Sequence, residues 1–160
     1  MSQEHAESPP ARAPWPPILV ALAIVAGLAL DRLSGGALAG LAKFPGAPYL
    51  GALVVLAAIA NDIWCAAALA RQKTTILPHR AASSLVTDGP FHWSRNPIYV
   101  SHVAVVLGLS LILGSPFTLL LTPLLAFGLQ KLAVEPEERH LLSRFGDDYR
   151  AYMARTRRWL

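Results

Sequence analysis

The sequence predicts an all-α integral membrane protein with four transmembrane helices and a C-terminal helix lying on the cytoplasmic membrane surface. Hydrophobic residues make up 54% of the 160 residues and charged residues only 15%, whereas a soluble domain carries about 25% charged residues. The charges are clustered, which leaves four apolar runs close to the ~20 residues needed to cross a bilayer. The runs lack the two-residue alternation of barrel strands, so each is predicted to be a helix.

The first apolar run covers residues 15–33 and opens a single membrane domain that we expect to extend over 15–160. The preceding residues 1–14 are rich in proline and small polar residues, which predicts a disordered tail. This flank holds one arginine and two glutamates, which does not fit the basic start of a secretory signal, although Ala-Leu-Ala at 37–39 resembles a cleavage site.

The remaining predicted spans cover about 48–70, 97–113 and 116–134. Only Gly114 and Ser115 separate the last two runs, so these helices must form an antiparallel hairpin. Gly108 and Gly128 are expected to let neighbouring backbones approach closely. Pro123 is expected to kink the fourth span, because its ring clashes with the preceding turn.

The distribution of basic residues predicts the orientation. Four lie in the 71–96 segment, namely Arg71, Lys73, Arg80 and Arg95, and seven more lie from Lys131 to the end of the chain. The 34–47 loop holds only Lys43. By the positive-inside rule, both termini and the 71–96 loop are cytoplasmic. The net charge of +4 therefore indicates membrane orientation, and no stripe of basic and aromatic residues indicates nucleic-acid binding.

The C-terminal segment has the pattern of a helix lying at the membrane surface. Its apolar residues recur at spacings of four, four and three, on one helical face: Leu141, Phe145, Tyr149 and Tyr152. Arginines fill the other faces, which suits an anionic leaflet. A bend is expected at Phe145-Gly146. A surface helix beside acidic lipid does not explain why three carboxylates, those of Glu135, Glu137 and Glu138, lie at its start.

Other reactive residue types give little evidence of a site. Cys65 is the single cysteine and lies inside the second predicted span, where a small buried side chain is the simplest interpretation. The five histidines show no metal-ligand spacing, so no metal site is expected. Asp62 lies inside the same span, where a charge should be paired or functional, and we expect Arg95 or Lys131 as its partner.

The segment TDGPFHWSRNPIY at 87–99 is the most informative stretch of the chain. It is a polar turn that leads directly into an apolar helix, and ionisable groups at the edge of hydrocarbon mark a site by default. The Asn96-Pro97 pair suits a helix start, with asparagine as the cap and proline at the first position.

Together with later motifs, this segment resembles the integral-membrane methyltransferase superfamily that includes isoprenylcysteine carboxyl methyltransferase and the phospholipid methyltransferases. The matching pieces are LVTDGPF at 85–91, RNPIY at 95–99, EERHLLSRFGDDYRAY at 137–152 and the closing RRWL. Asn96 stands where the carboxyl methyltransferases usually have histidine. That departure favours a lipid amine or another amphiphile over isoprenylcysteine as the substrate.

The resemblance implies S-adenosylmethionine as the methyl donor, bound at the cytoplasmic face between segments 74–99 and 135–152. The implied cofactor-binding residues are His79, Leu85, Val86, Gly89, Phe91, Arg95, Asn96, Pro97, Tyr99, Glu137 and Glu138. In this scheme Arg95 or His79 takes the cofactor carboxylate, either glutamate pairs with its ammonium, and backbone groups near Gly89 hold the adenine. The implied catalytic residues are Arg95, Glu138 and Tyr99, with Tyr99 facing the sulfonium and Glu138 as the base for an amine acceptor.

Methyl transfer from a sulfonium is an in-line displacement that depends mainly on alignment. The expected acceptor is a membrane-embedded amphiphile carrying a lipid amine, a prenylcysteine-like carboxylate or a thiol. Two other functions stay open: a membrane reductase of the sterol reductase type, which uses a nicotinamide cofactor, and a non-catalytic four-helix membrane protein. The oligomeric state is left undetermined by the sequence.

Overall fold

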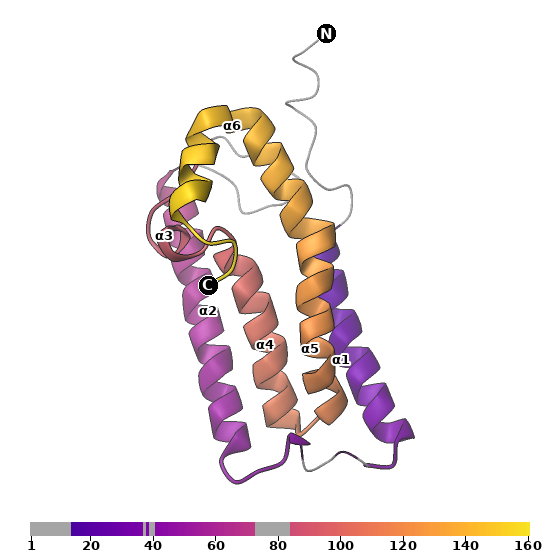
Figure 1. Ribbon diagram of the computed structural model, residues 1–160. Helices are drawn as coiled ribbons and strands as arrows, with labels where there is room; N and C mark the ends of the chain where they lie inside the picture. Colours follow the sequence, from indigo (N-terminus) through magenta and orange to yellow (C-terminus); the bar gives the residue numbers. More distant parts are fainter. Residues whose placement is uncertain (1–13, 37, 39–40, 73–83) are drawn as a thin grey trace.

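The computed structural model describes residues 14–36, 38, 41–72 and 84–160, and over these ranges the chain is helical (Figure 1). The elements are α1 (Trp15–Leu33), α2 (Ala47–Arg71), α3 (Pro90–Trp93), α4 (Pro97–Leu113), α5 (Pro116–Leu129), the π-helical turn η2 (Gln130–Val134) and α6 (Glu135–Arg155). In the described part of the chain the only extended pairing is an isolated bridge between Ser94 and Arg157. The prediction of an all-α protein is confirmed, while the predicted tail lies almost entirely outside the described residues.

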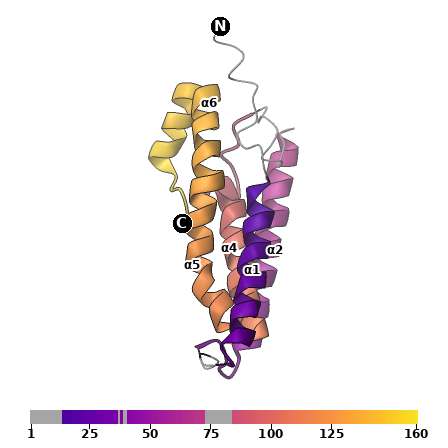
Figure 2. The same cartoon turned by 90° about the vertical axis from the view of Figure 1, so that its right-hand side faces the viewer.

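The long helices form a bundle in which α4 lies between α2 on one side and α5 with α1 on the other (Figures 1 and 2). Three helical stretches are long and apolar enough to cross a membrane: Trp15–Leu33, Ala47–Arg71 and the continuous Pro116–Arg155. The helix α4 is apolar but has only 17 residues. Membrane-embedded character is thus supported, and the count of four spans stays a prediction.

The hairpin between α4 and α5 forms as predicted. Gly114 ends α4 in the left-handed conformation with φ 60°, which glycine adopts at no steric cost. Ser115 then caps α5 by accepting a hydrogen bond from the Thr118 amide at 3.2 Å. The Asp31 carboxylate of α1 accepts further bonds from the Ser115 hydroxyl and, at 3.2 Å, from the Phe117 amide. One carboxylate therefore ties the end of α1 to the start of α5.

Glycine sets the distance between α2 and α4. A Cβ on Gly51 would collide with the Gly108 carbonyl oxygen, and one on Gly108 would lie 2.7 Å from the Gly51 carbonyl oxygen. The expected close approach at Gly108 therefore occurs against α2. At Gly128 a Cβ would make only an ordinary contact, 3.5 Å from Leu19.

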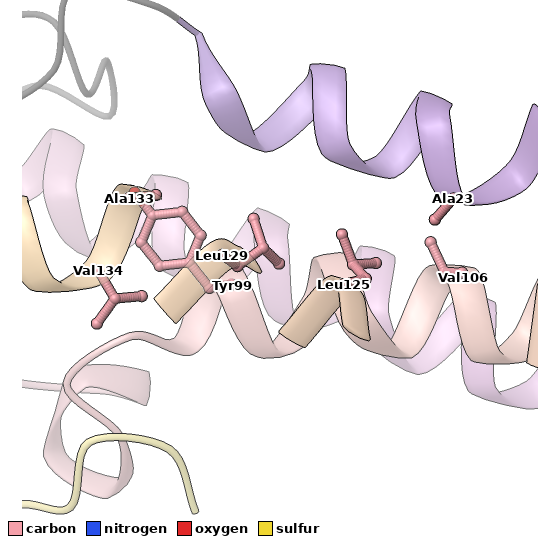
Figure 3. Packing of buried hydrophobic residues seen from close by; sticks show 7 residues of the cluster. All are labelled: Ala23, Tyr99, Val106, Leu125, Leu129, Ala133 and Val134. Carbon is pink, nitrogen blue, oxygen red and sulfur yellow. The ribbon is translucent and has the colours of Figure 1, made fainter. Parts of the chain in front are cut away.

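The buried core lies where α1, α4, α5 and η2 meet (Figure 3). It contains Ala23, Tyr99, Val106, Leu125, Leu129, Ala133 and Val134. On the outer faces, large apolar residues such as Val25 at 65% and Ile63 at 66% are exposed. This pattern suits a lipid-facing bundle, because lipid tails are as apolar as leucine side chains.

The end of the bundle that carries the candidate site contains two irregular helical segments. The helix α5 runs through Pro123 without a break and then widens into η2 over Gln130–Val134. Further on, Gly146 takes φ 51° and ψ −120° inside α6, so the predicted bend at this glycine is confirmed. The bend turns the end of α6 back toward α3 and the start of α4 (Figure 1).

Candidate functional site

The chain after α6 returns to the loop that precedes α4, and its backbone carbonyl groups accept hydrogen bonds from that loop. The Arg95 amide donates to the Arg157 carbonyl at 2.8 Å. The Asn96 side-chain amide donates to the Arg158 carbonyl at 3.0 Å. Asn96 therefore begins α4 as predicted, but its side chain makes no cap bond and instead holds the C-terminal segment.

Buried aromatic residues of α6 support the same loop. Tyr152 is 3% exposed and donates to the Phe91 carbonyl at 2.5 Å. Tyr149, at 1% exposed, packs beside it with ring centroids 5.9 Å apart. Burial raises the pKa of both phenols, so each stays protonated, and the Tyr152 hydroxyl acts as a donor. The predicted apolar face of this helix thus packs in part against protein.

Glu138 is held by two arginines from different parts of the chain. The Arg158 Nε lies 3.2 and 3.1 Å from the two carboxylate oxygens, and its Nη2 lies 2.8 Å from Oε2. The Arg95 Nη2 approaches Oε1 at 3.4 Å. A forked, charge-assisted pair of this kind orients both groups. The carboxylate of Glu138 is therefore occupied by protein partners in this structure.

Glu137 has a different environment from its neighbour. Its Oε2 accepts a hydrogen bond from the Tyr99 hydroxyl at 2.8 Å. Burial raises the pKa of Glu137, the bond from Tyr99 lowers it in part, and the nearby charge of Glu138 raises it further. In the described part of the chain Glu137 forms no ion pair, so it is the carboxylate left to receive a cationic group.

Arg95 retains hydrogen-bonding capacity beyond its contact with Glu138. Its side chain is 11% exposed, and its Nε is buried without a partner among the described residues. A buried guanidinium donor without an acceptor is costly, so the site suits an additional anionic group. The planar fork of arginine matches a carboxylate.

The rest of the predicted cofactor site lies in the segment before α4 and at Pro97, the first residue of α4. Val86 and Pro97 are buried and Leu85 and Phe91 are half-buried, while His79 lies outside the described residues. Gly89 has φ 60°, and a Cβ there would lie 3.1 Å from the Trp64 indole nitrogen. A cavity of about 120 Å³ runs between this turn and the end of α2. Only a glycine permits both the turn and this close approach.

The ion pair expected for Asp62 does not form with either predicted partner. Arg95 pairs with Glu138, and Lys131 pairs with Glu135 at 2.7 Å. Asp62 keeps a buried Oδ1 without a hydrogen-bond partner among the described residues. Its neighbour Asn61 instead bonds to α4, donating to the Ser101 hydroxyl at 2.9 Å and to the Pro97 carbonyl at 3.0 Å.

Sequence reasoning gave no role to several residues that build the site. Arg158 binds Glu138, and the Trp159 indole donates to the Gln130 side chain at 3.1 Å. Ser94, which is 2% exposed, accepts a bond from the Asn96 amide at 3.1 Å. The closing RRWL motif was the available signal for Arg158 and Trp159. It could not show which carboxylate the arginine meets.

Comparison with known proteins identifies relatives of the chain. The chain is 36% identical over 107 residues to the nickel-cobalt-cadmium resistance protein NccN of Alcaligenes xylosoxydans xylosoxydans, a match that covers 67% of this chain and 46% of that protein. It is 37% identical over 68 residues to a protein-S-isoprenylcysteine O-methyltransferase of Schizosaccharomyces pombe, covering 42% of this chain and 29% of that protein. The chain thus spans less than half the length of these two relatives.

A third relative is an uncharacterized protein of Haemophilus influenzae, 33% identical over 63 residues, which covers 39% of this chain and all of that protein. No solved structure matches the chain. Residues 47–148 match the phospholipid methyltransferase family. This segment is more than half of the chain and contains α2, the loop before α4, and the Glu137-Glu138 pair. The chain therefore belongs to the phospholipid methyltransferase family.

Proposed function

We propose that the protein transfers a methyl group from S-adenosylmethionine to an amphiphilic acceptor at the cytoplasmic boundary of a membrane. The observation that carries this proposal is the convergence of Arg95, Tyr99, Glu137 and Glu138 from two distant segments onto one place. Membership in the phospholipid methyltransferase family supports the same reaction class.

The residues present fit the charged groups of the cofactor. The free Nε of Arg95 suits the cofactor carboxylate, and Glu137 suits its ammonium, because Glu138 is already paired with Arg158. The backbone around Val86 and Gly89 suits the adenine edge, as the turn there lies against α2. When bound, the cofactor supplies an electrophilic methyl group on a sulfonium. The chain's own residues orient that group and exclude water from it.

The acceptor is proposed to be a membrane-dissolved amphiphile whose nucleophilic head reaches the level of Tyr99. This level is the start of α4, where apolar helix gives way to the polar loop. A lipid amine, a prenylcysteine-like carboxylate and a thiol all meet this description. Each buried methylene of a tail contributes about 0.8 kcal/mol to membrane binding, so a long chain concentrates the acceptor beside the enzyme.

A thermal-shift measurement with S-adenosylhomocysteine tests the cofactor assignment. A ligand that binds only the folded state raises its stability by linkage. The intact protein should be stabilised, and Arg95→Ala or Glu137→Gln should lose the shift. Arg157→Ala is the matched control, since the Arg157 side chain makes no ion pair in the described part of the chain. An unchanged melting temperature at saturating ligand contradicts the proposal, and a shift with NADPH instead indicates a reductase.

A methylation assay with labelled donor and a membrane lipid extract tests the acceptor. Label should appear in an amphiphilic product. Shortening the acceptor tail should raise KM far more than it lowers kcat, because the tail is remote from the bond being made. Equal methylation of a fully water-soluble acceptor and its long-chain counterpart would contradict entry from the bilayer.

A further inference from the structure

Asp62 and His102 lie on the same side of the contact between α2 and α4. The two helices are antiparallel, since Gly51 meets Gly108 while Asn61 meets Ser101 further along α2 and earlier along α4. Each successive helical residue turns by about 100°. In an antiparallel pair, the residue after Asn61 and the residue after Ser101 therefore rotate toward the same side, at depths that differ by about 3 Å.

The opposite side of this contact carries an apolar groove of about 550 Å³. Its lining includes Ala57 and Trp64 of α2 with Val100 and Ala104 of α4. Neither Asp62 nor His102 lines that groove. Two ionisable side chains therefore share one side of the helix pair, and the groove occupies the other side.

His102 is held in one tautomer by its own helix. Its Nδ1 lies 2.7 Å from the Ile98 carbonyl oxygen, which only accepts, so Nδ1 carries the hydrogen. The lone pair is then on Nε2, the nitrogen that a general base uses. The ring is tilted against Tyr99 with centroids 6.1 Å apart, and Tyr99 donates to Glu137. His102 therefore neighbours the proposed cofactor residues.

Asp62 supplies a negative charge on the same side. Its buried Oδ1 has no partner in the described ranges. Among the described residues, the titratable groups around this region are Asp62 and Cys65 on α2, Tyr99 on α4, and Glu137 beyond Tyr99. Helix α5 contains no ionisable residue, and the Asp31 and Arg32 of α1 lie at the opposite end of the bundle.

We propose that Asp62 and His102 receive the head of an amine acceptor, with Asp62 attracting the ammonium and the His102 Nε2 accepting its proton. This inference rests on the proposed methyltransferase function and assigns two residues to the amine among its proposed acceptors. The acceptor N–H bond breaks, and its proton moves to Nε2. The nitrogen lone pair forms the new N–C bond to the donor methyl. The S–C bond breaks, and its electron pair stays on sulfur.

The alternative base, Glu138, is disfavoured by its contacts. Both of its oxygens accept from Arg158, and Arg95 approaches one of them. Proton transfer to this carboxylate would have to break a forked ion pair. His102 has a lone pair that no described residue occupies.

The first test measures binding and requires no turnover. Dodecyltrimethylammonium, a permanent cation with an apolar tail, is titrated against the full chain in lipid nanodiscs with saturating S-adenosylhomocysteine. Asp62→Asn should weaken its binding roughly tenfold, because a charge contact is lost. Asp31→Asn is the matched control, since that carboxylate is bonded to Ser115 and Phe117 at the other end of the bundle. Equal binding by the wild type and Asp62→Asn overturns the proposal.

The second test uses turnover of dodecylamine, with dodecanethiol and dodecanoic acid as comparison acceptors. His102→Asn is the informative variant, because an asparagine Nδ2 stands where Nδ1 stands and can still donate to the Ile98 carbonyl. It has no counterpart of Nε2. Amine methylation should fall about 100-fold or more in kcat with little change in KM. Turnover of His102→Asn within twofold of wild type overturns the proposal.

The shift caused by S-adenosylhomocysteine separates this inference from the proposed function. It should persist in Asp62→Asn and His102→Asn, because neither side chain bonds to Arg95 or Glu137, the residues proposed to hold the charged groups of the cofactor. If the wild type shows the shift but methylates only the thiol or the acid, the amine assignment fails and the methyltransferase stands. If the wild type shows no shift, both fail.

Discussion

Removing the side chain of Arg158, which binds Glu138 from the C-terminal segment, should lower the free energy of unfolding measurably. The perturbation is Arg158→Ala. It deletes three contacts of 2.8 to 3.2 Å to Glu138, whose side chain is 9% exposed. Hydrogen bonds to charged groups contribute about 1.5–3 kcal/mol. The Arg158 side chain is 39% exposed, so water screens part of the interaction.

We therefore expect a loss of about 2 kcal/mol in the free energy of unfolding, toward the lower end of the range for charged hydrogen bonds. For a chain of this size that corresponds to a fall of roughly 4–8 °C in Tm. Arg158→Lys keeps the charge but loses the fork, so its loss should be intermediate. Arg157→Ala should stay within about 0.5 kcal/mol of the wild type, as for other surface substitutions.

The assay is denaturant unfolding of the purified chain in detergent, combined in a double-mutant cycle with Glu138→Gln. Residues in one ion-pair network show coupling energies of about 0.5–3 kcal/mol. We expect at least about 1 kcal/mol here, because the pair is forked and largely enclosed. Simple additivity of the two single mutants, or an Arg158→Ala protein as stable as the wild type, would refute the reasoning.

Three other predictions concern the carboxylate, the helix contact and the topology. Burial raises the pKa of Glu137, so folding favours its protonated form: stability is highest below the ordinary pKa of a glutamate and is lost as pH rises through the raised value. Tm measured against pH should show this loss in the wild type and a flatter profile in Glu137→Gln; identical profiles would contradict the assignment. Gly108→Ala should cost about 1–3 kcal/mol through overpacking against Gly51, measured by denaturant unfolding, whereas Gly128→Ala should be nearly neutral. In a Cys65→Ala background, cysteines at Gln72 and Asp148 should react with an impermeant thiol reagent from the cytoplasmic side only, and one at Lys43 from the other side only; labelling of Gln72 and Lys43 from the same side would break the four-span topology.

The sequence by itself was sufficient for the long helices, and it indicated the segments of the proposed site. Long apolar runs dictate helices in lipid through the backbone alone, which requires no knowledge of partners. The short Gly114-Ser115 connection dictates a hairpin, and the bend at Gly146 follows from a residue that tolerates positive φ. The RNPIY and EER motifs identified the loop before α4 and the start of α6 as the places to look.

The tertiary structure decided which charged groups are paired and which are free. Glu137 and Glu138 are adjacent in sequence, but a turn of about 100° between them sends one to Tyr99 and the other to Arg158. Arg158 reaches Glu138 across 20 residues only because α6 reverses at Gly146. Asp62 does not pair with its predicted partners, because Arg95 binds Glu138 and Lys131 binds Glu135. Hydrophobic periodicity is a local property of the chain, whereas the partner of a charge depends on where distant segments are brought together.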